Sequence, residues 1–294
     1  MRVLVLGAGG QLGKDLVPTL RSHGHEVVAA HRKVVDVTDS GAVAAALNQS
    51  GPDRVVNCAA YTKVDQAERE PALAFAINRD GARVVAEACA ERSIPLCHIS
   101  TDFVFSQPPP CPAVPWGVSA HPLPKGVYAS SKREGELACE AAGGELFLVR
   151  TSWLYGNDGP NFPLAILRAA AVGRPLQVVS DQVGSPTWTG ALAAALTWLL
   201  GTRHFGIFHL SGGGSTSWYE FARAAVQEAG LTAEIHPVTA AEWGAPAPRP
   251  SYSVLDNSSF SRLGGPSLPA WRASLATYIE EERQGAVLTA TAGV

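Results

Sequence analysis

The chain begins with Met1-Arg2-Val3-Leu4-Val5-Leu6, which leads directly into Gly7-Ala8-Gly9-Gly10-Gln11-Leu12-Gly13. The apolar run predicts a buried strand, and the glycines after it predict a tight turn followed by a helix from about Gln11. Glycines three residues apart let the backbone turn, approach a diphosphate and pack closely against the strand. The helix start would direct free N–H groups at that diphosphate. A glycine pattern alone is weak evidence, but its position after a buried strand favours a dinucleotide site.

The rest of the first half alternates strands and helices. Strands are predicted near residues 26–30, 54–60, 96–99 and 146–150. Helices are predicted between them, and this alternation is typical of an α/β protein with a Rossmann-type, doubly wound parallel sheet. We therefore expect residues 1–150 to form an NADP-binding Rossmann domain.

Beyond residue 150 the repeating pattern loosens, which predicts a smaller α/β substrate-binding lobe. We assign residues 151–187 and 212–283 to this lobe. An apolar helix and a strand within residues 188–211 are expected to return to the main sheet. Residues 284–294 are small and polar enough to form a flexible tail.

Composition excludes several classes of function. The 294 residues are 46% hydrophobic and carry a net charge of −3, which argues against a nucleic-acid or anionic-membrane partner. No apolar run reaches the roughly 18 residues of a membrane span, so a cytoplasmic protein is expected. The five cysteines are odd in number and lack a C-x-x-C pair, so neither a disulfide framework nor a metal site is predicted.

The end of the second predicted strand indicates which nicotinamide cofactor is preferred. An NAD site usually has an acid there, but this chain has His31-Arg32-Lys33. Cations suit the 2′-phosphate of NADPH, with NADH as a possible substitute, although a solvated turn is the alternative. Asp36 could accept from the adenine amine or act only as a cap or turn former. The predicted cofactor-binding residues are Gly7, Gly10, Gln11, Leu12, Gly13, His31, Arg32, Lys33, Asp36, Val37, Ala59, Ala60, Tyr61, Tyr128 and Lys132.

Two sets of polar residues suggest catalysis. Thr101 and Asp102 follow the fourth predicted strand, at the edge where parallel sheets place their chemistry. Tyr128 and Lys132 are four residues apart on a predicted helix, so they share one face. An ammonium group beside a phenol favours the phenolate, so we expect Lys132 to lower the pKa of Tyr128. This spacing is common on helix surfaces and is informative only together with the nucleotide fold.

Motifs across nearly the whole chain resemble the extended short-chain dehydrogenase/reductase superfamily and, more narrowly, the dTDP-4-dehydrorhamnose reductase family. The glycine turn and the Tyr128/Lys132 pair indicate the superfamily. The narrower family is indicated by Arg150-Thr151-Ser152-Trp153 and Asp181-Gln182-x-Gly184-x-Pro186-Thr187. Further matching stretches are Asn57-x-Ala59-Ala60-Tyr61-Thr62, Ser100-Thr101-Asp102-Phe103-Val104-Phe105, Gly135-Glu136 and Arg249-Pro250-x-x-Ser253.

The resemblance implies that NADPH delivers hydride to C4 of dTDP-4-dehydro-6-deoxy-L-mannose, which yields dTDP-L-rhamnose. Thr101 would hydrogen-bond the 4-keto oxygen, Tyr128 would protonate it, and Lys132 would bind the nicotinamide ribose. The catalytic residues implied are thus Thr101, Tyr128 and Lys132. The substrate-binding residues implied are Val64, Asp102, Phe103, Trp153, Asn161 and Gln182.

Two departures from the family pattern and several rival functions remain. Residues 106–124 lack the acidic residues usual before the catalytic tyrosine, which leaves the substrate open. Some members are dimers bridged by Mg²⁺, but Lys14-Asp15 gives no clear match, so we expect a monomer or homodimer without metal. Phe103 stands where related dehydratases have a glutamate, and Arg32 disfavours an NAD-retaining epimerase of another nucleotide sugar. A non-catalytic regulatory subunit resembling that of methionine adenosyltransferase is the alternative from another class.

Overall fold

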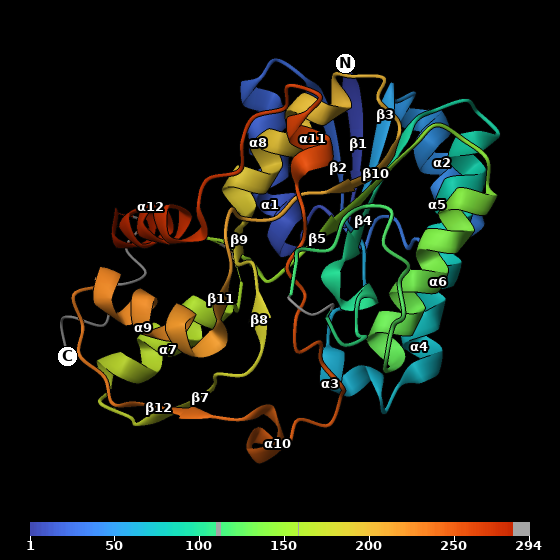
Figure 1. Cartoon of the computed structure of the whole chain (residues 1–294). Helices are drawn as coiled ribbons and strands as arrows, with labels where there is room; N and C mark the ends of the chain where they lie inside the picture. Colours follow the sequence, from blue (N-terminus) through green and yellow to red (C-terminus); the bar gives the residue numbers. More distant parts are fainter. Residues whose placement is uncertain (110–112, 158, 285–294) are drawn as a thin grey trace.

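The computed structural model describes residues 1–109, 113–157 and 159–284. Its centre is a six-stranded sheet in the order β10-β5-β4-β3-β1-β2, with every pair parallel (Figure 1). The strands are β1 (Arg2–Leu6), β2 (Glu26–Ala30), β3 (Arg54–Asn57), β4 (Leu96–Thr101), β5 (Leu146–Thr151) and β10 (Gly206–His209). The predicted Rossmann-type fold class is confirmed.

Both faces of this sheet are covered by helices, and β1 shows why its sequence is continuously apolar. Val3 and Val5 lie in a core with α1 (Gln11–Ser22) and α8 (Thr189–Leu200). Leu4 and Leu6 belong to a second core on the other face. Successive strand side chains point to opposite faces, so a strand buried on both sides needs apolar residues throughout. The second core is closed by α2 (Ser40–Ser50), α5 (Gly81–Ala90) and α6 (Val127–Ala141).

The strand order places a crevice at the carboxyl ends of β1 and β3. β1 pairs with β2 on one side and with β3 on the other, so the chain leaves these neighbouring strands toward opposite sides. Open parallel sheets bind ligands where the strand order reverses in this way. The loops after β1, β2 and β3 are therefore the first place to look for a site.

A second group of elements lies beside the sheet (Figure 1). Its helices are α7 (Phe162–Ala171), α9 (Trp218–Glu228) and α12 (Trp271–Gln284), whose apolar side chains form two further cores. Its strands pair as β7 (Leu176–Val179) with β12 (Ile235–Val238), β8 (Val183–Gly184) with β11 (Thr216–Ser217), and β6 (Leu154–Tyr155) with β9 (Thr187–Trp188). The short helix α10 (Ala240–Trp243) follows β12.

Two details differ from the sequence expectation. Helix α11 (Ser258–Ser261) falls within the range assigned to the second lobe, but its Phe260 is fully buried in the core beneath the main sheet. An edge-on contact with Trp198 of α8 holds it there. Separate helices are predicted near residues 71–77 and 80–91, but one π-helical turn (Ala76–Asp80) joins α4 (Pro71–Phe75) to α5. The expected tail beyond Gln284 lies outside the described residues.

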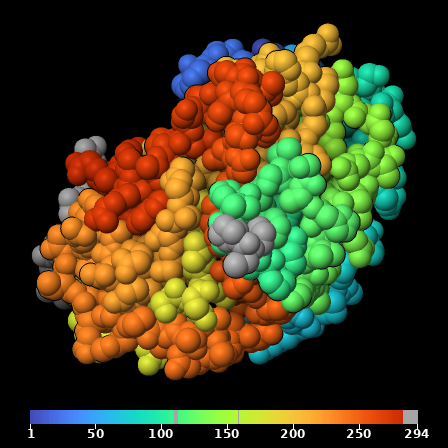
Figure 2. Space-filling model, viewed as in Figure 1, coloured from blue at the N-terminus to red at the C-terminus, as the bar shows by residue number. Residues whose placement is uncertain are grey.

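The segment after β4 crosses to the second group of elements. Trp116 donates from Nε1 to the carbonyl of Tyr252 at 3.1 Å, and its backbone forms a parallel β-bridge with Leu255. Figure 2 shows this green segment beside the orange segment that precedes α11. The two segments therefore meet over the carboxyl end of the sheet. Within the described residues, no helix is long and apolar enough to cross a membrane.

Candidate active site

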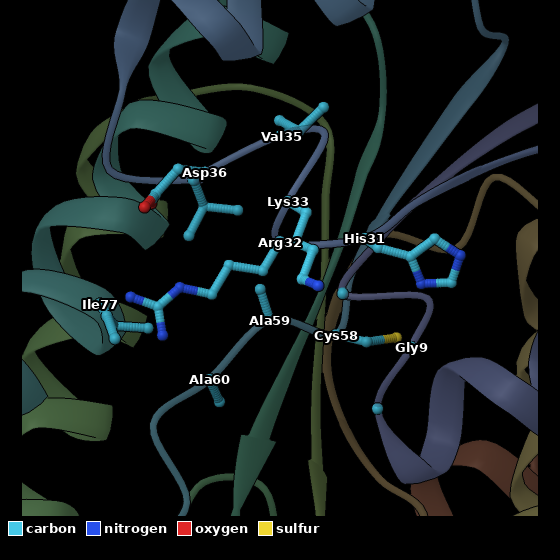
Figure 3. A pocket seen from close by; sticks show the side chains of 13 residues that line it. Gly9, His31, Arg32, Lys33, Val35, Asp36, Cys58, Ala59, Ala60 and Ile77 are labelled. Carbon is cyan, nitrogen blue, oxygen red and sulfur yellow. The ribbon is translucent and has the colours of Figure 1, made fainter.

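A cavity of about 500 Å³ lies at the carboxyl ends of β1, β2 and β3 (Figure 3). It sits in the crevice that the strand order creates. Nine of the predicted cofactor residues line it, namely Gly7, Gly10, His31, Arg32, Lys33, Asp36, Val37, Ala59 and Ala60. Gly9, Val35, Cys58 and Ile77 also line it but were not singled out from the sequence. Gly9 lies inside the quoted glycine turn, whereas nothing in the pattern around Ile77 marks it.

The glycine turn has the geometry of a phosphate cradle. Gly7 has a φ of 72°, and a Cβ there would lie 2.6 Å from the backbone nitrogen of Ala59. A Cβ on Gly13 would lie 2.6 Å from the Cα of Ala8, so this glycine lets α1 sit close to the strand end. Gly10 caps α1 without any side-chain hydrogen bond, which leaves the positive helix end open to an anion.

Gln11 and Leu12 contribute to this site only through the helix backbone. The Leu12 side chain is buried in the core, and the Gln11 amide lies between the carbonyl of Leu154 and the N–H of Gly156. Tyr61 does not line the cavity, because its hydroxyl donates to Glu70 at 2.7 Å. Its predicted cofactor contact is therefore not provided by its side chain.

The basic run after β2 borders the same cavity. His31, Arg32 and Lys33 are exposed, and the Arg32 side chain extends across the cavity toward Ile77 in Figure 3. Asp36 accepts from the backbone N–H and the hydroxyl of Thr38 at 3.0 and 2.8 Å. These hydrogen bonds lower the pKa of Asp36. Asp36 is thus a turn former that also lines the cavity, and helix α2 is capped by Asp39 instead.

Thr101 and Tyr128 meet at the carboxyl end of β4. The Thr101 hydroxyl lies near the Tyr128 phenol, and Phe103 contacts the phenol ring edge-on at 5.3 Å between centroids. Burial raises the pKa of Tyr128 to about 12, while the neighbouring Thr101 hydroxyl opposes that rise. The phenol is therefore fully protonated at neutral pH and able to donate.

Lys132 does not act on Tyr128 as the sequence suggested. Its ammonium is buried and donates to the carbonyl of Ile99 at 2.7 Å. Burial lowers the pKa of Lys132 to about 8, and Lys132 is not among the groups that shift the pKa of Tyr128. The expected lowering of the tyrosine pKa is thus wrong for this arrangement, because the ammonium is aimed at the strand. The charge of Lys132 does affect Cys58, so this group lies beside the cavity.

A buried ion pair supports the helix that carries Tyr128 and Lys132. Glu136 on α6 accepts two hydrogen bonds from Arg150 on β5, both at 2.8 Å, and one from Ser100 on β4 at 2.6 Å. Burial opposes ionisation of Glu136, but its hydrogen bonds to Arg150 and the other donors outweigh burial and lower its pKa. The pair fixes α6 against two adjacent strands.

A second cavity, of about 340 Å³, lies among α7, β7, α9 and α10. Gln182, which is predicted to bind substrate, is buried at its wall. Its cations are Arg174 and Arg249, and its aromatic walls include Trp218 and Trp243. The arrangement offers both positive charge and flat apolar surface in one place.

The other predicted substrate residues line neither cavity. Trp153 has a φ of 46° and stacks on Trp218 with 3.6 Å between ring centroids. Val64 begins α3 (Val64–Ala67), and Phe103 lies against Tyr128. Asn161 caps α7 by accepting from Leu164, and its amide nitrogen donates to Gly156 and Tyr278. The fold itself therefore occupies the Asn161 side chain.

The part of the chain that the structure describes contains no group of three or more histidine, cysteine, aspartate or glutamate side chains arranged to hold a metal ion.

Comparison with known proteins identifies the family. The family model described as the RmlD substrate binding domain matches residues 1–284. The dTDP-4-dehydrorhamnose reductase of Streptomyces griseus is 42% identical, over 93% of this chain and 91% of the relative. The spore coat polysaccharide biosynthesis protein SpsK of Bacillus subtilis is 41% identical, over 95% of this chain and 97% of the relative.

A solved structure agrees with these sequence matches. The dTDP-4-dehydrorhamnose reductase of Bacillus anthracis, crystallised in complex with NADP, superposes with a TM-score of 0.91 at 37% identity. The superposition covers 95% of this chain and 99% of that chain. By sequence and by structure, the chain belongs to the dTDP-4-dehydrorhamnose reductase family, which confirms the resemblance that its motifs carry.

Proposed function

We propose that the protein uses NADPH to reduce the 4-keto group of dTDP-4-dehydro-6-deoxy-L-mannose and releases dTDP-L-rhamnose. The observation that carries this proposal is the protonated Tyr128 phenol, which lies next to Thr101 at the carboxyl edge of the sheet, the same edge that holds the first cavity. A positioned proton donor is what reduction of a ketone requires once hydride arrives. The reductase name borne by the Streptomyces griseus relative supports the same reaction.

The first cavity fits the cofactor. Gly7, Gly10 and the open N-terminus of α1 would hold its diphosphate, and Arg32 with Lys33 would hold the 2′-phosphate. Lys132 would bind the nicotinamide ribose from its buried position near Cys58. When bound, NADPH supplies the hydride. The NADP complex of the Bacillus anthracis protein supports this assignment.

The protein's own groups then complete the reduction. Thr101 would donate a hydrogen bond to the keto oxygen and thereby stabilise the charge that develops on it. Tyr128 would transfer its phenolic proton to that oxygen. Phe103 excludes water from one edge of the phenol ring. The removal of water strengthens both interactions with the oxygen.

The second cavity fits the nucleotide end of the substrate. Arg174 and Arg249 would neutralise the diphosphate, while Trp218 and Trp243 offer apolar surface to the base. Under this proposal residues 151–187 and much of 212–283 form the substrate-binding lobe, except α11, and Trp153 with Val64 and Asp102 surrounds the sugar. The hexose itself would lie between the two cavities.

The test follows NADPH absorbance in the presence of dTDP-4-dehydro-6-deoxy-L-mannose generated in place. Oxidation that depends on this substrate, and that is faster with NADPH than with NADH, would support the proposal. Faster turnover of another dTDP-linked 4-keto-6-deoxy sugar would assign that sugar instead. A protein that binds NADPH but turns over none of them would favour the non-catalytic regulatory function.

A further inference from the structure

The carboxyl group of Asp102 is buried without a cation. Asp102 starts a 3₁₀ turn directly after β4, and only 1% of its surface is exposed. Moving an unpaired carboxylate out of water is costly, so such groups bind protons more tightly. The cations of this region bind elsewhere: Lys132 to the carbonyl of Ile99, Arg249 to Asp65, and Arg150 to Glu136.

The polar neighbours of Asp102 compensate for burial only in part. Thr101 donates to its Oδ1 at 3.1 Å. The Ser253 hydroxyl approaches the carboxyl and lowers its pKa, but no hydrogen bond of regular geometry reaches Oδ2. Burial is the larger effect and raises the pKa of Asp102 to about 7. Both protonation states are therefore populated near neutral pH.

The ionised form turns the hydrogen bond of Thr101 away from a substrate. A hydroxyl group has one proton, and an ionised carboxylate can only accept. With Asp102 ionised, the proton of Thr101 is committed to Oδ1. The Thr101 proton thus points toward Asp102 and is not directed at a keto oxygen.

Protonation of Asp102 reverses the direction of the hydrogen bond between Asp102 and Thr101. A protonated Oδ1 donates to Thr101, and the Thr101 hydroxyl is then free to donate outward. The charge of Asp102 also raises the pKa of Tyr128, so neutralisation makes the phenol a stronger acid. The two effects act in the same direction. The proton that moves to the substrate belongs to Tyr128, and Asp102 keeps its own.

We propose that Asp102 is a positioning residue that acts in its protonated form, donating to Thr101 and thereby freeing the Thr101 proton for the keto oxygen of the substrate. This inference rests on the proposed reductase function. Other titratable groups on neighbouring elements are Tyr128 and Lys132 of α6, Arg150 of β5 and Tyr252 beside Ser253. Among these, Tyr128 is the one whose pKa carries a contribution from the charge of Asp102.

The test compares pH profiles of kcat at saturating NADPH and sugar nucleotide. Wild-type kcat should fall above about pH 7 by about tenfold per pH unit, as for loss of one required proton. Asp102→Asn supplies a permanent N–H donor, so it should stay active and lose this alkaline fall. Asp102→Leu cannot donate and should be slow throughout, while NADPH binding by both variants shows that they fold.

A second variant moves the same ionisation without touching Asp102. Ser253→Ala removes a hydroxyl that lowers the pKa of Asp102, so the alkaline fall should shift to higher pH. The inference is overturned if Asp102→Asn binds NADPH but is inactive, or if its kcat still falls above about pH 7 as in the wild type. It is also overturned if the kcat of Asp102→Leu equals that of Asp102→Asn. An inactive wild-type enzyme would instead overturn the proposed function, which separates the two failures.

Discussion

At the scale of single residues, Tyr128 carries the strongest claim. We expect Tyr128→Phe to reduce kcat by about 10²- to 10⁴-fold, the usual contribution of a positioned proton donor. Phenylalanine keeps the ring that contacts Phe103, so the NADPH dissociation constant should change little. Steady-state rates and fluorescence titration with NADPH measure the two quantities. Tyr219→Phe is the matched control, because this ring lies under the guanidinium of Arg223 on α9, away from Thr101 and Phe103. Unchanged turnover in Tyr128→Phe would remove the assignment.

Arg32 tests the cofactor preference. Its guanidinium crosses the first cavity, where it can pair with the 2′-phosphate that distinguishes NADPH from NADH. Arg32→Ala should weaken NADPH binding by roughly 10- to 100-fold, as expected for loss of a charge-assisted hydrogen bond, and leave NADH binding nearly unchanged. Titration with each cofactor measures this. Arg83→Ala, which breaks only a surface pair with Glu87, serves as the control. Equal losses for both cofactors would contradict the 2′-phosphate contact.

At the scale of elements, the ion pair between Glu136 and Arg150 holds α6 to the sheet. Glu136→Gln leaves Arg150 buried without its partner, which costs about 3–5 kcal/mol in such pairs. Because the folded-state pKa of Glu136 is lowered, its stabilisation is present above the unfolded pKa and is lost as pH falls through the folded value. Urea unfolding should therefore show a large deficit at neutral pH that narrows in acid.

The control for this prediction lies on the same helix. Glu134 pairs with Arg79 at the surface, at 3.3 Å, so Glu134→Gln should cost less than about 1 kcal/mol. If the two glutamine variants lost the same stability, the buried pair would not be what fixes α6.

Elements also differ in how well the sequence predicts them. The strands of the main sheet follow from short apolar runs, and their predicted bounds agree closely with the structure except for β3, which ends at Asn57 and not near residue 60. The two-residue strands β8 and β11 are too short to have a period. The position of α11 follows from one aromatic residue, Phe260, that enters a distant core. Such contacts depend on the folded chain and leave no local pattern.

The candidate site shows the same division. The glycine turn, the basic run and Tyr128 lie in local motifs and could be identified from the sequence. The direction in which the Lys132 side chain points could not be predicted. Helical spacing gives the face of α6 but not whether the ammonium reaches Tyr128 or the carbonyl of Ile99. The approach of Ser253 to Asp102 joins residues 151 positions apart in sequence (253 − 102), and only the fold brings them together.

At the scale of the whole molecule, Asp65 and Arg249 connect the two groups of elements. Asp65 on α3 accepts from both terminal nitrogens of Arg249, at 3.0 and 2.9 Å, and from the N–H of Ala247 at 3.1 Å. The hydrogen bond from Arg249 lowers the pKa of Asp65, so the pair persists throughout the neutral range and is lost only in acid. Arg249 also lines the second cavity. The contact therefore fixes a proposed substrate residue from across the molecule.

We expect Asp65→Asn to raise the KM for the sugar nucleotide about tenfold, because Arg249 loses its two-point anchor while its charge remains. The dissociation constant of NADPH should not change, since the first cavity is formed by other loops. The free energy of unfolding should fall by less than about 1 kcal/mol, because nearly half of the Asp65 side chain is exposed. Glu87→Gln, in a surface pair on α5, is the control for loss of one carboxylate. A KM that stays at the wild-type value, or a parallel loss of NADPH affinity, would show that this contact does not order the second cavity for substrate.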